Sequence, residues 1–259
     1  MDLKYMNFKD QNGIGRAHFN RPEKLNALNT DVFRDLETIM SCCEDDDTIR
    51  VVIFTGNEKA FVAGADIENM SKGDIRSAYE LTDLTMRVQE RLADLPKPTI
   101  AAISGYALGA GCEVALCCDF RIASQNAVFG LPVVKLRIIP GYGSTQRLPR
   151  IIGIAKAKEL LFTGEQISAD EELSIGLVNQ AVDYDQLDGT VEKFADKLIA
   201  LPPLSLRSLK EAIQFGMQMD LESAIRMESY LFANCFGSED RIEGVRAFLE
   251  KRKPKFKGF

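Results

Sequence analysis

The sequence predicts an α/β fold in which strands and helices alternate through the first half of the chain and helices dominate the second half. Three runs rich in β-branched and other apolar residues are typical of strands: AHFN at 17–20, VVIFTG at 51–56 and TIAAISG at 99–105. Helical patterns separate these runs, at about 31–43 and 74–94. This alternation implies crossover connections, and therefore a sheet that helices cover.

The first predicted helix has a clear start and one apolar face. Thr30 and Asp31 are candidates for its N-cap. Its apolar side chains recur every three or four residues, at Val32, Phe33, Leu36, Ile39 and Met40. The second helix ends before Pro96 and Pro98, which mark the entry to the strand that begins near Thr99.

After about Pro149 the pattern becomes mostly helical. Helices are expected at 153–162, 168–176, 185–200, 203–216 and 220–236. One short strand is expected within LVNQAV at 177–182. Since neither a low-complexity linker nor an internal repeat divides the chain, we expect one α/β domain with a helical C-terminal portion.

Composition argues against several classes of protein. The chain of 259 residues is 46% hydrophobic, as is usual for a globular protein, and its net charge of −6 argues against nucleic-acid binding. No apolar run approaches the roughly 20 residues that span a bilayer, so we expect no membrane segment. The polar N-terminus has no hydrophobic stretch of the kind found in a secretory signal. We therefore expect a cytoplasmic protein.

The side chains present also limit the chemistry. His18 is the only histidine, so a multi-histidine metal site cannot form and we expect no metal. Any Ser–His–Asp triad would have to use His18, which is better explained as an ordinary strand residue. The six cysteines include no CxxC pair, which excludes zinc-ribbon and thioredoxin spacing. Carboxylates and backbone dipoles remain as the tools of catalysis.

Two segments rich in small residues are candidates for a site: FVAGADI at 61–67 and SGYALGAGCEVALCCDFRIAS at 104–124. In the second, Gly109, Ala110 and Gly111 lead into an apolar helical run. The free N–H groups at such a helix start suit a carbonyl oxygen that gains negative charge. Glu113 falls in the first turn, either as an acid–base group or as an acid that complements the helix dipole.

These two segments occur together with three others, in an order that is typical of a known family. RPEKLNALN at 21–29 precedes them, IPGYGSTQRLPR at 139–150 follows them, and FLEKRKPKFKG stands at 248–258. Over essentially its whole length the chain resembles the enoyl-CoA hydratase/isomerase (crotonase) family, and its C-terminus resembles bacterial short-chain hydratases of that family. The resemblance implies a spiral of ββα units in a core at 1–195. It also implies a helical region at 196–259 that forms a homotrimer or hexamer.

The resemblance also assigns roles to residues. It implies an acyl-CoA substrate and no cofactor beyond the coenzyme A of that substrate. The thioester oxygen would bind in an oxyanion hole made by the backbone N–H groups of Ala65 and Ala110. The substrate and its coenzyme A would be contacted by Lys24, Leu25, Ala63, Asp66, Ile67, Val133 and Gly141. The loop and helix at about 69–92 would shape the acyl pocket.

One departure from the family pattern concerns the catalytic acids. Hydratases of the family place two glutamates beside the double bond, and Glu113 matches the first of these. Val133 occupies the position of the second, in FGLPVVKLR at 129–137, and Arg137 replaces a glycine. Gly141 stands where some relatives have aspartate. The neighbouring Tyr142 supplies a hydroxyl to the site or is a packed surface tyrosine.

Three activities are compatible with this pattern. In the first, which we favour, Glu113 alone activates water and returns its proton, so that the protein hydrates an enoyl-CoA or dehydrates the product in reverse. The second is other enolate chemistry, namely isomerisation, decarboxylation or thioester hydrolysis. The third is a non-catalytic acyl-CoA-binding subunit.

Overall fold

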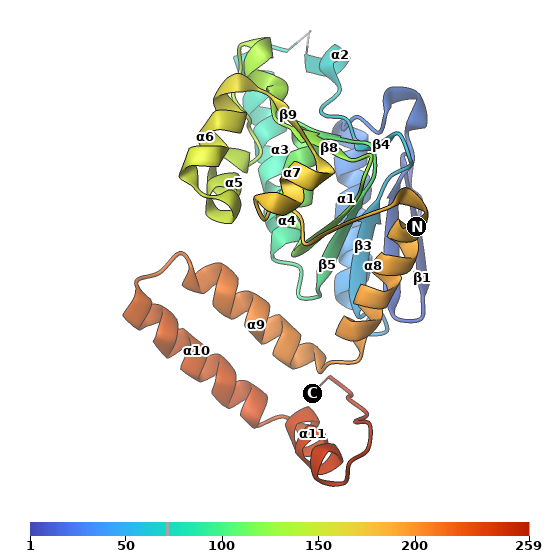
Figure 1. Ribbon diagram of the computed structural model, residues 1–259, viewed down its shortest axis with the longest axis vertical. Coiled ribbons are helices and arrows are strands. Elements are labelled where there is room, and N and C mark those ends of the chain that lie inside the picture. Colours follow the sequence, from blue (N-terminus) through green and yellow to red (C-terminus); the bar gives the residue numbers. More distant parts are fainter. Residues whose placement is uncertain (71–72, 259) are drawn as a thin grey trace.

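The computed structural model describes residues 1–70 and 73–258. Two sheets and the helices around them form the body of the molecule, and a long helical pair stands away from it (Figure 1). None of the helices in the described part of the chain is long and apolar enough to cross a membrane.

The larger sheet has six strands in the order β1-β2-β3-β5-β7-β10. Strand β1 pairs antiparallel with β2, and every other neighbouring pair is parallel. The strands are β1 (Met6–Gln11), β2 (Ile14–Phe19), β3 (Val51–Thr55), β5 (Thr99–Ile103), β7 (Phe120–Ser124) and β10 (Gln180–Val182). The sequence pattern did not indicate β1 or β7, and it placed the start of β2 three residues late. The short strand expected within 177–182 is β10, at the end of that segment.

The smaller sheet has four strands in the order β4-β6-β8-β9. They are β4 (Ala60–Val62), β6 (Tyr106–Leu108), β8 (Val128–Gly130) and β9 (Gln166–Ser168). In three successive turns of the chain, one strand joins the larger sheet, the next joins the smaller sheet, and a helix follows. This repetition is the ββα spiral that the resemblance predicts. At the corner between β5 and β6, a Cβ on Gly105 would lie 2.1 Å from the Lys59 carbonyl oxygen, so the corner requires glycine.

Three helices of the first half lie close to the candidate active site. Helix α1 (Thr30–Asp45) is capped by Asn29, whose side chain accepts a hydrogen bond from the Val32 N–H. The cap thus precedes both predicted candidates by at least one residue. Helix α3 (Ile75–Ala93) begins with a capping box, and α4 (Ala110–Cys117) is buried at every residue. The remaining short elements here are η1 (Pro22–Lys24), α2 (Ile67–Met70) and η2 (Pro132–Leu136).

The second half is helical, as predicted, with two helices that the pattern did not indicate. The predicted helices correspond to α6 (Ile154–Thr163), α7 (Ala169–Ser174), α8 (Tyr184–Ile199), α9 (Pro203–Gly216) and α10 (Leu221–Phe236). The additional ones are α5 (Ser144–Ile152) and α11 (Glu239–Leu249). Pro149 lies inside α5, which explains why a sequence rule that ends helices at proline missed it.

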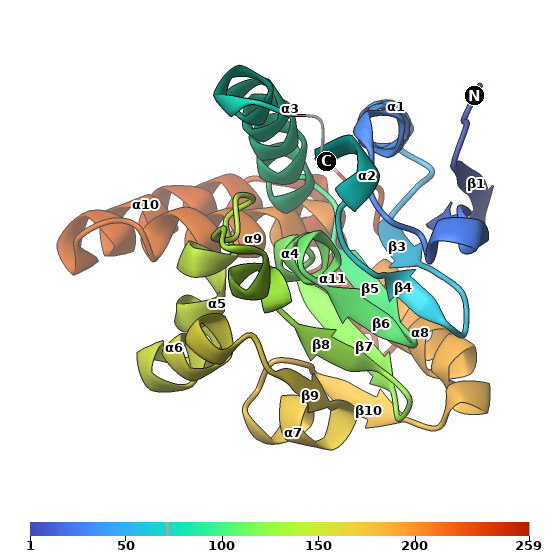
Figure 2. The same cartoon turned by 90° about the horizontal axis from the view of Figure 1, so that it is seen from above.

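The larger sheet is buried on both faces, which accounts for the unbroken apolar runs in its central strands. On β3, Val52 and Phe54 pack into the core shared with α1, whereas Val51 and Ile53 pack against α8. Figure 2 shows α1 and α8 on opposite sides of this sheet. Helix α4 lies in the first of these cores, beside the smaller sheet (Figure 2). The start of α4 is therefore packed within this core and against the smaller sheet.

Candidate active site

The first candidate donor, Ala65, lies on a short segment that pairs with residues 25–28. Leu28 donates its N–H to the Gly64 carbonyl oxygen over 2.8 Å and accepts from the Asp66 N–H over 2.8 Å. These two bonds form a parallel bridge between Leu28 and Ala65. In such a bridge the intervening residue directs its own N–H away from the partner segment. The Ala65 N–H is therefore available to a ligand.

The second candidate donor, Ala110, is the first residue of α4. The first intrahelical bond of α4 runs from the Glu113 N–H to the Gly109 carbonyl oxygen, so the N–H groups of the preceding residues have no partner within the helix. A Cβ at Gly111 would lie 2.0 Å from the Val62 carbonyl oxygen. Only glycine permits this close approach, which places the start of α4 against β4 and beside the Ala65 segment.

Both donors line one apolar cavity of about 470 Å³. The cavity brings together seven of the predicted site residues, namely Ala63, Ala65, Ile67, Ala110, Glu113, Val133 and Gly141. Helix α3 adds Ala78, Leu81 and Thr82, from the segment at about 69–92 that is expected to shape the pocket. Residues 71–72 of that segment lie outside the described residues. The sequence analysis missed Leu136, Ile138 and Ile139, which also line it. The apolar residues at the end of η2 and shortly after it were the signal for them, since a surface loop is usually polar.

Glu113 is the only carboxylic acid among the described residues that line this cavity. Its side chain is 2% exposed, and its Oε1 accepts hydrogen bonds from the N–H groups of Tyr142, at 3.0 Å, and Ser144, at 3.1 Å. Burial raises the pKa of Glu113 above its ordinary value, although these donors and the Arg147 guanidinium oppose the shift. One carboxylate oxygen is thus fixed by backbone N–H groups at the start of α5 and just before it.

Val133 and Tyr142 complete the surroundings of the acid. Val133, on η2, lies beside the donor segment, since a Cβ on Gly109 would be 3.5 Å from its Cγ1. Arg137 ends η2 in the left-handed region with φ 62°, a conformation that suits the glycine it replaces. Tyr142 is only 7% exposed, so the interpretation of a surface tyrosine is wrong. Burial and the charge of Glu113 raise the pKa of its phenol to about 12, so it stays protonated.

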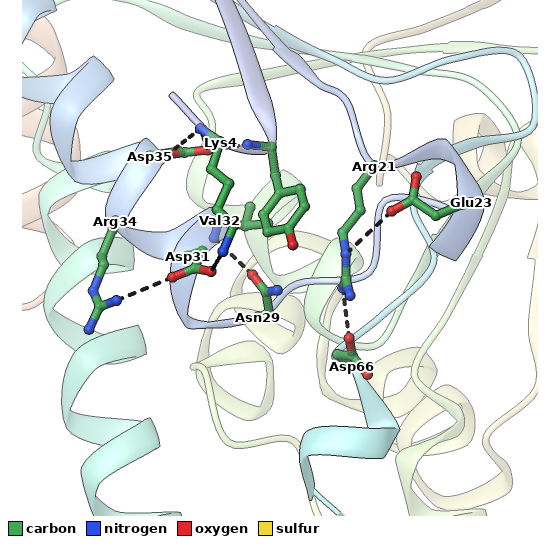
Figure 3. Close-up of polar contacts among 10 residues, drawn as sticks. Lys4, Arg21, Glu23, Asn29, Asp31, Val32, Arg34, Asp35 and Asp66 are labelled. Atoms are coloured by element: carbon green, nitrogen blue, oxygen red, sulfur yellow. Dashed lines mark hydrogen bonds and ion pairs between the residues drawn. The ribbon is translucent and has the colours of Figure 1, made fainter. Parts of the chain in front are cut away.

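Three of the predicted coenzyme A contacts, Lys24, Leu25 and Asp66, do not line the cavity. Leu25 accepts the Ala63 N–H over 3.0 Å, and Lys24 forms an ion pair of 3.1 Å with Glu68. The Asp66 side chain turns to Arg21 (Figure 3). Across residues 1–70 and 73–258, no group of three or more His, Cys, Asp and Glu side chains has an arrangement that could hold a metal ion.

The arrangement can be compared with known proteins. The family model for enoyl-CoA hydratase/isomerase matches residues 9–258. The chain belongs to the enoyl-CoA hydratase/isomerase family. It is 43% identical over 254 residues to the short-chain-enoyl-CoA hydratase of Clostridium acetobutylicum, covering 98% of this chain and 97% of the relative. It is 45% identical over 240 residues to the crotonyl-CoA hydratase of Syntrophomonas wolfei, covering 92% of each.

Solved structures of enoyl-CoA hydratases share the fold. That of the enoyl-CoA hydratase from Bacillus anthracis superposes with a TM-score of 0.96 at 38% identity, over 99% of this chain and 100% of the other. One from Geobacillus kaustophilus gives 0.95 at 38% identity, over the full length of both chains. The predicted family and its crotonase-like α/β fold with C-terminal helices are confirmed.

Proposed function

We propose that this enoyl-CoA hydratase/isomerase family member adds water to the double bond of a short-chain enoyl-CoA to give a 3-hydroxyacyl-CoA, with Glu113 as its one acid–base group. Its hydratase relatives, at 43% and 45% identity, support hydration as the reaction. The observation that carries the residue assignment is the lone carboxylate of Glu113, which lines an apolar cavity together with two candidate N–H donors.

The proposed reaction uses both N–H donors and the one acid. The thioester oxygen accepts hydrogen bonds from the N–H groups of Ala65 and Ala110, which draws electron density from the β-carbon. Glu113 removes a proton from water, the resulting hydroxyl forms a bond to the β-carbon, and the electron pair of the double bond moves to the thioester enolate. Protonation of the α-carbon by Glu113 then restores the carboxylate. Losing one donor of such a hole costs about 3–4 kcal/mol of transition-state stabilisation.

Val133 has no proton to transfer, so a single acid must serve both steps. Burial favours this, because a raised pKa makes Glu113 a better base towards water and lets it hold the proton until the α-carbon takes it. Coenzyme A would be held by Lys24 and Leu25, which do not line the cavity, and by the loop of Ala63, Asp66 and Ile67.

The helical C-terminus supports an oligomer. Several large apolar side chains of α9, α10 and the turn between them are exposed in the single chain, among them Ile213 (66%), Met217 (73%), Leu221 (77%) and Phe232 (66%). We infer that the region at 196–259 associates with further copies in a homotrimer or hexamer of a cytoplasmic enzyme, outside the core at 1–195. Light scattering should give a multiple of three chains, and a stable species of 28.8 kDa would contradict this.

A panel of acyl-CoA thioesters tests the reaction itself. Crotonyl-CoA, branched and cyclic enoyl-CoAs are incubated with the protein, and the products are weighed by mass spectrometry. A gain of one water supports hydration. Loss of CO2 or of the acyl group indicates decarboxylation or thioester hydrolysis, an unchanged mass with a moved double bond indicates isomerisation, and binding without product indicates a non-catalytic subunit.

A further inference from the structure

A nearly buried ion pair joins Arg21 to Asp66, the residue that follows the Ala65 donor. Arg21 is 11% exposed and Asp66 is 8% exposed, and Arg21 Nη1 lies 2.7 Å from Asp66 Oδ2 (Figure 3). The same nitrogen donates to the Ala27 carbonyl oxygen over 3.0 Å. One guanidinium group therefore links the segment that carries Leu28 to the residue that follows Ala65.

Arg21 is itself held in place. Its guanidinium lies over the ring of Tyr5, 5.1 Å from the centroid. Its backbone N–H donates to Asn26 Oδ1 over 2.9 Å, and the buried Asn26 donates in turn to the carbonyl oxygens of Ala60 and Phe61. Contacts with Tyr5, Asn26 and Ala27 thus fix Arg21 independently of its ion pair with Asp66. The ion pair therefore has little freedom to move.

The Ala65 N–H needs to be held in a fixed direction to act as a donor. The N–H of Ala65 belongs to the peptide that follows Gly64, whose φ of 130° lies outside the range that other residues favour. A glycine leaves this peptide free to rotate unless the peptide and its neighbours are held. The Leu28 N–H holds the carbonyl oxygen of the peptide, that of Gly64, over 2.8 Å. The Asp66 side chain is held by Arg21, and the Asp66 N–H by the Leu28 carbonyl oxygen at 2.8 Å. These two contacts fix the residue on the C-terminal side of Ala65.

We propose that Arg21 is a positioning residue for the reaction, and that its ion pair with Asp66 aims the Ala65 N–H at the thioester oxygen. This rests on the proposed function. It makes the Asp66 carboxylate a support of the oxyanion hole, so that the loop binds coenzyme A by its backbone and by its other side chains. Arg21 is too buried to bind a phosphate itself.

Kinetics of Asp66→Asn and Arg21→Lys give the first test. Asp66→Asn removes the charge but keeps the shape, and should lower kcat for crotonyl-CoA about tenfold while KM changes less than about threefold, because only the transition state bears the full oxyanion charge. Arg21→Lys keeps an ion pair and should lose less. Asp31→Asn is the matched control, since Asp31 pairs with Lys4 on the surface at 2.6 Å (Figure 3) and its kcat should stay within about twofold of the wild type.

Carbonyl polarisation gives the decisive readout. Crotonyl-CoA with a ¹³C-labelled thioester carbonyl is bound to Glu113→Gln protein, and the C=O stretch is measured by infrared difference spectroscopy. The stretch should fall on binding, and Asp66→Asn added to this variant should return it towards the frequency of the free thioester. If Asp66→Asn does not fold, Arg21→Lys serves instead, with a smaller return expected.

The outcomes separate the inference from the proposed function. If the C=O stretch of the bound thioester is the same in the Glu113→Gln/Asp66→Asn double variant as in Glu113→Gln alone, the positioning role is overturned, whatever the effect of Asp66→Asn on kcat. Continued turnover by Glu113→Gln overturns the proposed function instead, and the comparison of kcat and KM for Asp66→Asn still tests the positioning role.

Discussion

The backbone N–H of Ser144, the first residue of α5, donates a hydrogen bond of 3.1 Å to Glu113 Oε1. The carboxylate of α4 thus lies at the positive end of a second helix, which favours its charged form. Burial acts in the opposite direction and is the stronger effect, so the pKa of Glu113 is raised. The balance between these effects sets the pH at which Glu113 can act as a base.

The Ser144 hydroxyl belongs to this balance. Ser144 is 1% exposed, and its Oγ has no hydrogen bond of good geometry, yet its proximity to the Glu113 carboxyl lowers the pKa of that group. Ser144→Ala keeps the backbone donor and removes only the hydroxyl, so the pKa of Glu113 should rise further. Since Glu113 must be ionised to accept a proton from water, the rate falls as pH drops through its pKa.

The measurement is the pH profile of kcat/KM for crotonyl-CoA. The acid limb of the Ser144→Ala profile should move to higher pH, with little change on the alkaline plateau, whereas Ser144→Thr, which keeps a hydroxyl, should stay close to the wild type. An acid limb of Ser144→Ala at the wild-type pH would show that the hydroxyl does not act on Glu113.

Glu172 carries a second buried carboxyl, with a consequence for stability. It is fully buried, accepts the Phe129 N–H over 3.1 Å, and has no partner for Oε2 among the described residues. Burial raises its pKa from 4.5 to about 8. Between these values the unfolded chain is ionised and the folded chain is protonated, so the stability that Glu172 contributes falls as pH rises through this window.

Glu172→Gln removes the ionisation and keeps an acceptor for the Phe129 N–H. Chemical unfolding should therefore show a gain of about 1–3 kcal/mol in the free energy of unfolding at about pH 9, and little or no gain at about pH 5. Glu171→Gln, on the partly exposed neighbouring residue, is the control. Equal effects of Glu172→Gln at the two pH values would contradict the buried, protonated state.

The family and the heart of the site could be predicted because their signals are local. Gly109, Ala110 and Glu113 lie within five residues, and the structure places them together at one helix start. Strand β1 also has a local signal, because Asn12-Gly13 is a dipeptide typical of tight hairpin turns. Both residues have positive φ and form the turn between β1 and β2.

Other parts of the site depend on contacts between distant residues, which a pattern does not reveal. Arg21 and Asp66 lie 45 positions apart, and nothing in either segment indicates their ion pair. The placement of Tyr142 was wrong for the same reason. Its burial depends on the close contact of its ring with Phe33 from α1, at 6.1 Å between centroids, which only the folded chain brings about.

Substitution of Val133 tests whether the site lacks a second catalytic acid. Val133→Glu places a carboxyl in the same cavity as Glu113, and crotonyl-CoA hydration should rise about tenfold or more if a second acid is what the site lacks. Arg137→Gly is combined with it, because Arg137 holds a left-handed conformation that costs a non-glycine residue about 1 kcal/mol. Val133→Gln is the control, since it adds a similar side chain without an acid.

Rates across a range of pH are needed, because an apolar cavity raises the pKa of an introduced carboxyl. If both Val133→Glu variants fold and bind coenzyme A without a gain at any pH, the site is not a hydratase site that lacks one acid. Other enolate chemistry would then become the leading explanation.

The central claim is that Glu113 alone performs the proton transfers of hydration, and the rate of Glu113→Gln tests it most directly. Glutamine keeps the acceptor for the Tyr142 and Ser144 N–H groups but cannot take a proton from water. Hydration of crotonyl-CoA by Glu113→Gln should fall about 10²–10⁴-fold, while the Kd for a non-reactive acyl-CoA stays within about threefold of the wild type. A kcat within a few-fold of the wild type would assign Glu113 a purely structural role and contradict the account.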